Sequence, residues 1–391
     1  MTTQTRPVST DADRGVAPRS RAITLLVLGA VGASLAVAVG SPIATSVIGL
    51  ILFGILHNLL EIRYVAGRFS GVLARPFLDL LVALITGIVV CRLLVGVVGR
   101  PAQLAEILLG YGVLAAAAWH GLEGRRRVTA LAVVGTASVV SLTFPAYHFV
   151  VLTHLHNVVP LFFLWEWSRR IVSRRGRQAF RAVQLVWVVA VPAVILLGLI
   201  DGSLSADPGI VRSVVGDGQT VVASSAPPGA AATVVGMRLL TVFAFMQTMH
   251  YVVWVALMPR VAPDASAAFE ARVPWVTGPR LWAMGFMAAA VFAVLFGVDF
   301  VQGKALYAAL ASYHAYLELP VLLAMLLGAR GLAAATSGGT DDSTHDSTEV
   351  PAGTSVGDVT AAPVGGGGGG TGRGLGPGSA AAVAPEPEVH P

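Results

Sequence analysis

The sequence is poor in charged residues. Only 12% of its 391 residues are Asp, Glu, Lys or Arg, which is about half the share found in an average soluble domain. The mean hydropathy is +0.75. This composition excludes an ordinary water-soluble globular protein and indicates an integral membrane protein.

Cysteine, lysine and several common motifs are also scarce or absent. Cys91 is the single cysteine, which excludes an internal disulfide framework and any zinc or iron–sulfur site built from cysteines. Lys304 is the single lysine, and we interpret this as a compositional bias towards Arg. The sequence contains no Walker A loop, no G-x-S-x-G, no H-E-x-x-H and no C-x-x-C-H, so the classes that these motifs mark are not indicated.

Long apolar runs fill the middle of the chain. A spanning helix needs ~20 residues, and the uncharged run 23–60 is long enough for two, with a break expected at Gly40-Ser41-Pro42. The sequence therefore predicts an all-α membrane protein, a polytopic bundle of about ten transmembrane helices. The expected spans are 22–40, 43–61, 76–98, 102–122, 128–144, 146–168, 182–201, 239–258, 281–301 and 305–329.

The arginines predict the orientation of this bundle. With a cytoplasmic N-terminus, 21 of the 26 basic residues lie on the inner side, as the positive-inside rule requires. Both termini are then cytoplasmic, and we expect the protein in the cell membrane. The arginine cluster within 169–181 is expected to contact anionic membrane lipids, and no nucleic-acid partner is indicated.

The transmembrane domain is expected to cover residues 22–330. The polar segment 1–21 and the Gly/Ala-rich segment 331–391 are predicted to be disordered cytoplasmic tails, because neither can bury a core. The one sizeable outer loop, 202–234, is expected to be loosely ordered.

Polar residues inside apolar spans are the main functional signal, because they are costly in lipid and usually serve a site. Four separate spans carry a histidine near mid-membrane. Two of these histidines have a glutamate four residues later, on the same helix face. Imidazole and carboxylate groups together suit zinc, iron or manganese, and such a carboxylate can alternatively orient a ligand histidine. The predicted metal-binding residues are His57, His154, His250, His314, Glu61 and Glu318.

Two histidines lie on one predicted span, and they cannot both point to the same site. His154 and His156 are ~200° apart on a helix. We expect His154, with Asn157, to face inward and His156 to bond to a neighbouring helix. His148 is expected at the outer interface, and Glu166 in an interfacial salt bridge with the arginine cluster.

A cavity between the helices would admit a lipophilic small molecule from the membrane and exclude water. Polar and aromatic residues close to the predicted ligands are expected to line it. These residues are Asn157, Gln247, Tyr251, Trp254 and Tyr313.

Three short segments resemble the bacterial membrane β-carotene dioxygenases of the Brp/Blh type. ILHNLLEI, from His57 to Glu61, resembles an early His-Gly-x-x-Asp-like motif, with Asn58 in place of Gly and Glu61 in place of Asp. FMQTMHYVVW resembles a late H-x-x-x-H helix in part, with Gln247 in place of one His. ASYHAYLELP resembles the final histidine helix. The resemblance implies a polytopic helical protein with iron held by histidines on separate spans.

The leading hypothesis is a metal-dependent, iron-containing oxygenase-like enzyme acting on a lipophilic substrate, with haem, copper or zinc as other possible cofactors. One alternative is a b-type haem electron carrier with, for example, His154 and His250 as axial ligands. Another is a proton-coupled transporter, which broken helices at Pro160 or Pro320 would favour. The histidines could also make independent helix–helix hydrogen bonds.

Overall fold

The computed structural model describes residues 11–327, with side chains from residue 21 onward. The predicted tail 331–391 lies outside this range, and the first helix begins at Asp11, within the other predicted tail. The described part contains helices and no β-strand. The helices are α1 (Asp11–Gly40), α2 (Pro42–Arg68), α3 (Phe77–Val98), α4 (Arg100–Gly121), α5 (Gly124–Thr143), α6 (Pro145–His156), α7 (Pro160–Trp167), α8 (Arg174–Leu185), α9 (Val191–Leu196), α10 (Arg212–Val215), α11 (Gln219–Ala223), α12 (Val234–Tyr251), α13 (Met258–Val261), α14 (Pro263–Arg272), α15 (Gly278–Val298) and α16 (Phe300–Leu327).

The predicted all-α polytopic bundle is confirmed. Within residues 11–327, nine helical segments are long and apolar enough to cross a membrane. The tenth expected span, 128–144, does form a helix, α5, but is not among the nine, because its arginines and its Ser and Thr residues lower its hydropathy. Outward-facing apolar side chains such as Val97, which is 87% exposed, provide the surface expected for lipid contact.

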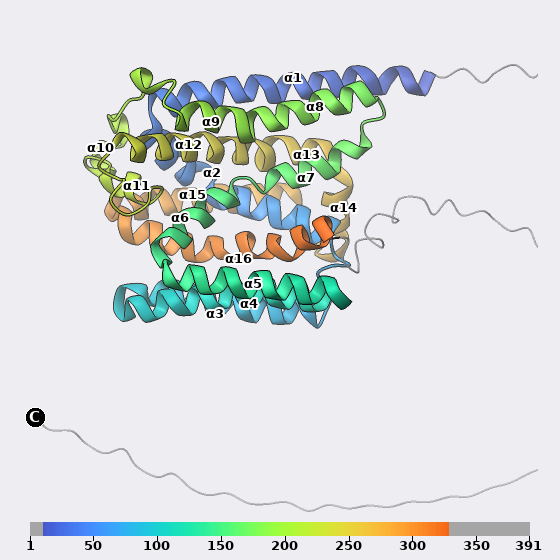
Figure 1. Ribbon diagram of the computed structural model, residues 1–391. Helices are drawn as coiled ribbons and strands as arrows, with labels where there is room; N and C mark the ends of the chain where they lie inside the picture. Colours follow the sequence, from blue (N-terminus) through green and yellow to red (C-terminus); the bar gives the residue numbers. More distant parts are fainter. Residues whose placement is uncertain (1–10, 328–391) are drawn as a thin grey trace, which may run out of the picture. The chain divides into compact units, whose positions relative to one another are not determined.

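Helix α2 lies at the centre of the bundle and packs against α12, α15 and α16. Helices α3 and α4 pack side by side and both contact α16. Figure 1 shows most of the long helices running roughly parallel, with α3, α4 and α5 on one side and α1, α8 and α9 on the opposite side. This arrangement brings helices from early and late parts of the chain to one interior.

Two glycines allow the helices to approach tyrosines of α16. A Cβ atom at Gly54 of α2 would lie 2.7 Å from the ring of Tyr307, and one at Gly110 of α4 would lie 2.9 Å from the ring of Tyr316. Both separations are below van der Waals contact, so a larger residue would displace the ring. The two tyrosines are thereby held beside the interior polar residues described below.

The span that contains His154 and His156 is broken in the middle. Helix α6 ends at His156, a turn covers residues 157–159, and α7 begins at Pro160. Proline has no N–H and clashes with the carbonyl four residues earlier, which here belongs to His156. That carbonyl accepts instead from the Val159 N–H at 3.1 Å. By contrast, α16 continues through Pro320.

The chain after α12 departs from α-helical geometry next to another histidine. Residues Val252–Leu257 form a π-helical segment that starts two residues after His250. Such segments are rare and are frequent at functional sites.

The outer loop 202–234 is not loosely ordered, contrary to expectation. It forms α10 and α11 and covers one end of the bundle (Figure 1). Val221, Val222 and Ser225 are buried, because α11 packs against α2 and α12. The apolar side chains of this small-residue segment are sufficient to bury it.

Helix α14 and several ion pairs lie at the other end of the bundle. Arg170 forms a two-pronged contact with Asp264, at 3.0 and 2.8 Å, and holds the pKa of that carboxyl below its usual value. Glu166 forms the predicted salt bridge, but its partner is Arg68 of α2, at 3.2 Å, rather than a member of the arginine cluster.

Candidate metal centre

Four histidines from four helices meet in the interior of the bundle. His57 lies on α2, His156 at the end of α6, His250 on α12 and His314 on α16. One ring nitrogen from each of the four lies within 4.8 Å of the corresponding nitrogens of the other three. The contacting ring centroids are 4.6–5.1 Å apart. These four side chains, called the histidine cluster below, are placed so that they could hold one metal ion.

The prediction that His154 rather than His156 faces the site is wrong. His154 points towards the outer loop, where its Nε2 lies 2.8 Å from the carbonyl oxygen of Ser225. His156 occupies the position in the cluster that was predicted for His154. The sequence indicates that only one of these two histidines can face the bundle interior, but it does not determine which face of α6 points inward.

Two histidines of the cluster are oriented by hydrogen bonds from the ring nitrogen Nδ1. The His57 Nδ1–H donates to the carbonyl oxygen of Phe53, at 2.9 Å, and the His156 Nδ1–H donates to Glu318 Oε2, at 3.1 Å. In each neutral ring the other nitrogen, Nε2, then carries a lone pair that can accept a hydrogen bond or bind a metal ion. Metal-binding histidines are commonly oriented in this way.

The shortest contact within the cluster joins two Nε2 atoms. His156 Nε2 and His314 Nε2 are 3.0 Å apart. This separation is compatible with a hydrogen bond, and equally with two ligands of one ion, since nitrogens bound at ~2.1 Å and at right angles lie about 3.0 Å apart.

The surroundings of His250 and Glu61 favour an ion over a simple hydrogen-bond network. Both side chains are 1% exposed. Neither ring nitrogen of His250 and neither carboxyl oxygen of Glu61 has a hydrogen-bond partner of good geometry within the described residues, although the Glu61 carboxyl lies beside that of Glu318. Buried polar atoms without partners destabilise a fold by about 1–3 kcal/mol each. A cation between them would bind both groups.

The two glutamates pair with histidines of other helices. Glu61 Oε2 lies 3.5 Å from His250 Nε2, and Glu318 contacts His156, whereas the sequence spacing suggested His57 and His314 as partners. Within residues 21–327, no Lys or Arg lies within 4.0 Å of either glutamate. The Glu61 and Glu318 carboxyl groups are in contact, so either a proton or a cation must lie between them; with both ionised, they would match the charge of one divalent cation beside four neutral imidazoles.

A cavity of ≈ 200 Å³ adjoins all four histidines. Of the residues predicted to line it, Asn157, Gln247 and Tyr251 do so. The Gln247 amide donates to the Tyr251 hydroxyl, at 2.7 Å. Lining residues that the sequence reasoning missed include Arg92, Lys304, Tyr307 and Tyr316.

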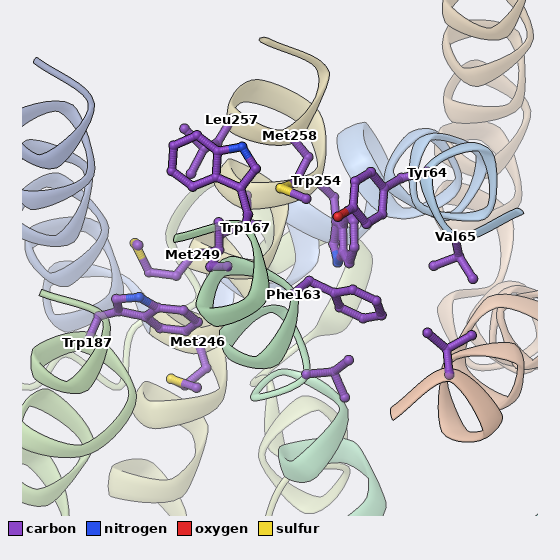
Figure 2. Close-up of a cluster of buried hydrophobic side chains, with 14 of the residues drawn as sticks. Tyr64, Val65, Phe163, Trp167, Trp187, Met246, Met249, Trp254, Leu257 and Met258 are labelled. Carbon is purple, nitrogen blue, oxygen red and sulfur yellow. The ribbon is translucent and has the colours of Figure 1, made fainter. Parts of the chain in front are cut away.

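Two residues predicted to line the cavity do not. Tyr313 points towards α3, where its hydroxyl lies 2.8 Å from Thr86 Oγ1. Trp254 is fully buried in an apolar cluster with Tyr64, Phe163, Met249 and others (Figure 2). Trp254 lies in the π-helical segment Val252–Leu257. Because this segment does not have the period of an α-helix, α-helical spacing from His250 did not predict the direction of its side chains.

A second cavity of ≈ 200 Å³ lies on the other side of His156. Besides His156 and Glu318 it is lined by leucines, Val159, Phe162, Ala315 and Tyr316. It shares Leu152, Leu155, Tyr316 and Leu319 with a larger apolar hollow of ≈ 700 Å³ between α4, α5, α6 and α16. His148, predicted at the outer interface, lines that hollow and contacts Ser141 Oγ at 3.1 Å.

The geometry does not suit the haem alternative with His154 and His250 as axial ligands. His154 bonds to the outer loop. A porphyrin held by two members of the cluster would occupy the space in which the other two rings lie, since the contacting rings are centred within 5.1 Å of each other.

Signals for some of the missed residues were present. Gly-Ser-Pro and Val-Pro steps predict helix breaks, and Pro160 marks the turn that ends α6 at His156. To predict the partners of Glu61 and Glu318, one must know which helices pack together, and spacing along one helix does not give this.

Comparison of the chain with protein-family models, with curated proteins and with solved structures finds no match.

Proposed function

We propose that the protein is a membrane-embedded, iron-dependent oxygenase that acts on a lipophilic substrate. The observation that carries the proposal is the convergence of four imidazoles from four helices beside two buried carboxylates. The predicted ligands His57, His250 and His314 belong to this set, with His156 in place of His154. Glu61 and Glu318 are assigned to orienting the rings and balancing the charge.

Iron is favoured by the donor set. Imidazole suits zinc, copper, iron and nickel, but four imidazoles complete the tetrahedral shell of zinc and form a closed structural site. Iron accepts six ligands and would retain two positions, which is the arrangement that oxygenase chemistry needs. Bound iron would supply the activation of O₂. The resemblance of the segments around His57, His250 and His314 to Brp/Blh-type dioxygenases supports the same reading.

A lipophilic substrate is favoured by the cavities. The hollow between α4, α5, α6 and α16 shares four lining residues with the apolar cavity beside His156. That cavity in turn shares Leu152, His156, Ala315 and Tyr316 with the cavity that adjoins the whole histidine cluster. An apolar chain entering from the membrane would meet mostly apolar and aromatic groups before His156, with Ser141 and His148 as polar groups in the outer hollow.

The residues of the chain would bind and orient rather than carry out the redox step. The hydrogen bonds from His57 to Phe53 and from His156 to Glu318 hold the two rings in one tautomer each. The covering loop and the close packing of the helices exclude water, which protects reactive oxygen species from side reactions.

The test is oxygen incorporation by the purified full-length protein in lipid nanodiscs. The protein is loaded with Fe(II) and incubated with a total membrane lipid extract under ¹⁸O₂. We expect ¹⁸O-labelled lipophilic products that are absent with His156→Ala and present with His154→Ala. Equal labelling by both variants, or none by the loaded wild type, would contradict the proposal.

A proton-coupled transporter remains the second candidate, because the break between α6 and α7 lies at the site. Half-helices at mid-membrane are typical of transporters. Uptake of a solute into proteoliposomes that is driven by a pH gradient and persists after removal of metal would favour this candidate.

A further inference from the structure

Lys304 lies in an unusual place for a lysine of a membrane protein. It is the single lysine of the chain, it is only partly exposed, and it lines the cavity that adjoins the histidine cluster. Its ammonium nitrogen is 5.8 Å from the ring centroid of Phe300. Lysines near the end of a span usually reach to the headgroups, whereas this side chain lines the cavity beside the histidine cluster.

The neighbouring basic residue has a carboxylate partner, and Lys304 does not. Arg92, which lines the same cavity, contacts Glu106 at 2.6 Å and the carbonyl oxygen of Ala308 at 2.7 Å. No carboxylate of the described residues lies within salt-bridge distance of Lys304. An ammonium group in a mostly apolar cavity is stabilised by an anion.

The cavities on either side of His156 differ in polarity. The one that Lys304 borders contains charged and polar side chains. The one beyond His156 is almost entirely apolar. Because the two share Leu152, His156, Ala315 and Tyr316, a single molecule with a charged head and an apolar chain fits the pair better than a pure hydrocarbon does.

We propose that the site takes a long-chain carboxylate, with the head group bound by Lys304 and the chain passing the histidine cluster into the apolar cavity. A single unpaired cation matches a monoanion, whereas a phosphate is usually bound by several donors. This inference names the substrate class for the proposed function and rests on it for the chemistry at the metal.

The placement also predicts which part of the substrate would react. Lys304 and His314 lie ten residues apart on the continuous helix α16, which corresponds to about 15 Å along the axis. A molecule held at Lys304 would therefore present a carbon in the interior of its chain, and not its head group, to the histidine cluster.

Binding of palmitate, hexadecanol and hexadecyl phosphate to the metal-free full-length protein in nanodiscs tests the inference. Because no metal is present, the result does not depend on the oxygenase proposal. We expect wild type to bind palmitate at least tenfold more tightly than hexadecanol. The preference should vanish in Lys304→Met and persist in Lys304→Arg. Arg100→Met, a change at an exposed basic residue outside the cavity, is the matched control and should keep the preference.

Three outcomes would overturn the proposal. Equal binding of palmitate and hexadecanol by wild type would show that the site does not select an anion. An unchanged preference in Lys304→Met, with the thermal stability of wild type, would show that Lys304 does not bind the head group. Tighter binding of hexadecyl phosphate than of palmitate, dependent on Lys304, would assign the site to phosphate-headed lipids.

Discussion

Two neighbouring clusters, joined where the His250 and Trp254 ring centroids lie 6.4 Å apart, are equally buried but differ in chemistry. In the apolar cluster, Met249, Trp254 and Leu257 pack with Phe163 and Tyr64 (Figure 2), and each apolar surface is covered by another. In the histidine cluster, His250 is 1% exposed and neither of its ring nitrogens has a hydrogen-bond partner of good geometry within the described residues. The apolar cluster is filled by its own side chains, and among those named above the buried polar atoms without a partner in the described part of the chain are two isolated groups, Trp254 Nε1 and the Tyr64 hydroxyl. The histidine cluster has the groups of a binding site.

The comparison predicts that the two clusters respond differently to removal of metal and to mutation. The apolar cluster should determine stability without affecting metal content, and the histidine cluster should link stability to metal. The following predictions test this distinction.

Removal of metal should have the largest effect. A ligand that is present at 1,000 times its Kd stabilises the folded state by about 4 kcal/mol, and the buried carboxylates Glu61 and Glu318 add to the cost of leaving the site without a cation. Chelator treatment should lower the unfolding temperature in detergent, and Fe(II) should restore it. A chelator-induced decrease of the same size in His156→Ala would show that the effect arises elsewhere.

Trp254→Ala should destabilise the protein and leave metal binding intact. Replacing a fully buried tryptophan by alanine costs about 3 kcal/mol or more, and Trp254 is 0% exposed. Denaturation in detergent should show this loss, while elemental analysis of the folded fraction should show the metal content of wild type. Loss of metal with retained stability would show that Trp254 serves the histidine cluster rather than the apolar cluster.

Glu318→Gln should have a smaller effect, confined to metal affinity. The amide oxygen of glutamine can still accept from His156 but lacks the charge, and changes at such orienting residues weaken metal binding about 10- to 100-fold. Competition with a chelator of known affinity measures the change. Glu106→Gln is the control, since Glu106 is also buried but pairs with Arg92. Equal weakening in both variants would argue against a specific role for Glu318.

Much of the fold was predictable because the length of an apolar run is a local signal. The break at Gly40-Ser41-Pro42 appears between α1 and α2 as expected. The tenth expected span, α5, is long enough to cross a membrane but has a low hydropathy. The prediction for the outer loop was wrong because small residues such as Ala226 can be buried. Hydropathy reports a preference for lipid and does not report packing between segments.

The candidate site was predictable only in part, for a related reason. Three of the four predicted histidines meet, because a polar residue in mid-span is confined to the bundle interior. The choice between His154 and His156 depends on how α6 is rotated, and the partners of Glu61 and Glu318 depend on which helices adjoin. The rotation of a helix and the identity of its neighbours are set by long-range packing, and residue spacing within one helix contains no information about either.

The most direct test of the central claim compares the metal content of two variants two residues apart. Wild type, His154→Ala and His156→Ala are purified in parallel, loaded with Fe(II) and desalted, and bound iron is measured by elemental analysis. The account predicts stoichiometric iron in wild type and His154→Ala and near-complete loss in His156→Ala. Equal iron in the two variants, or loss in His154→Ala alone, would contradict it.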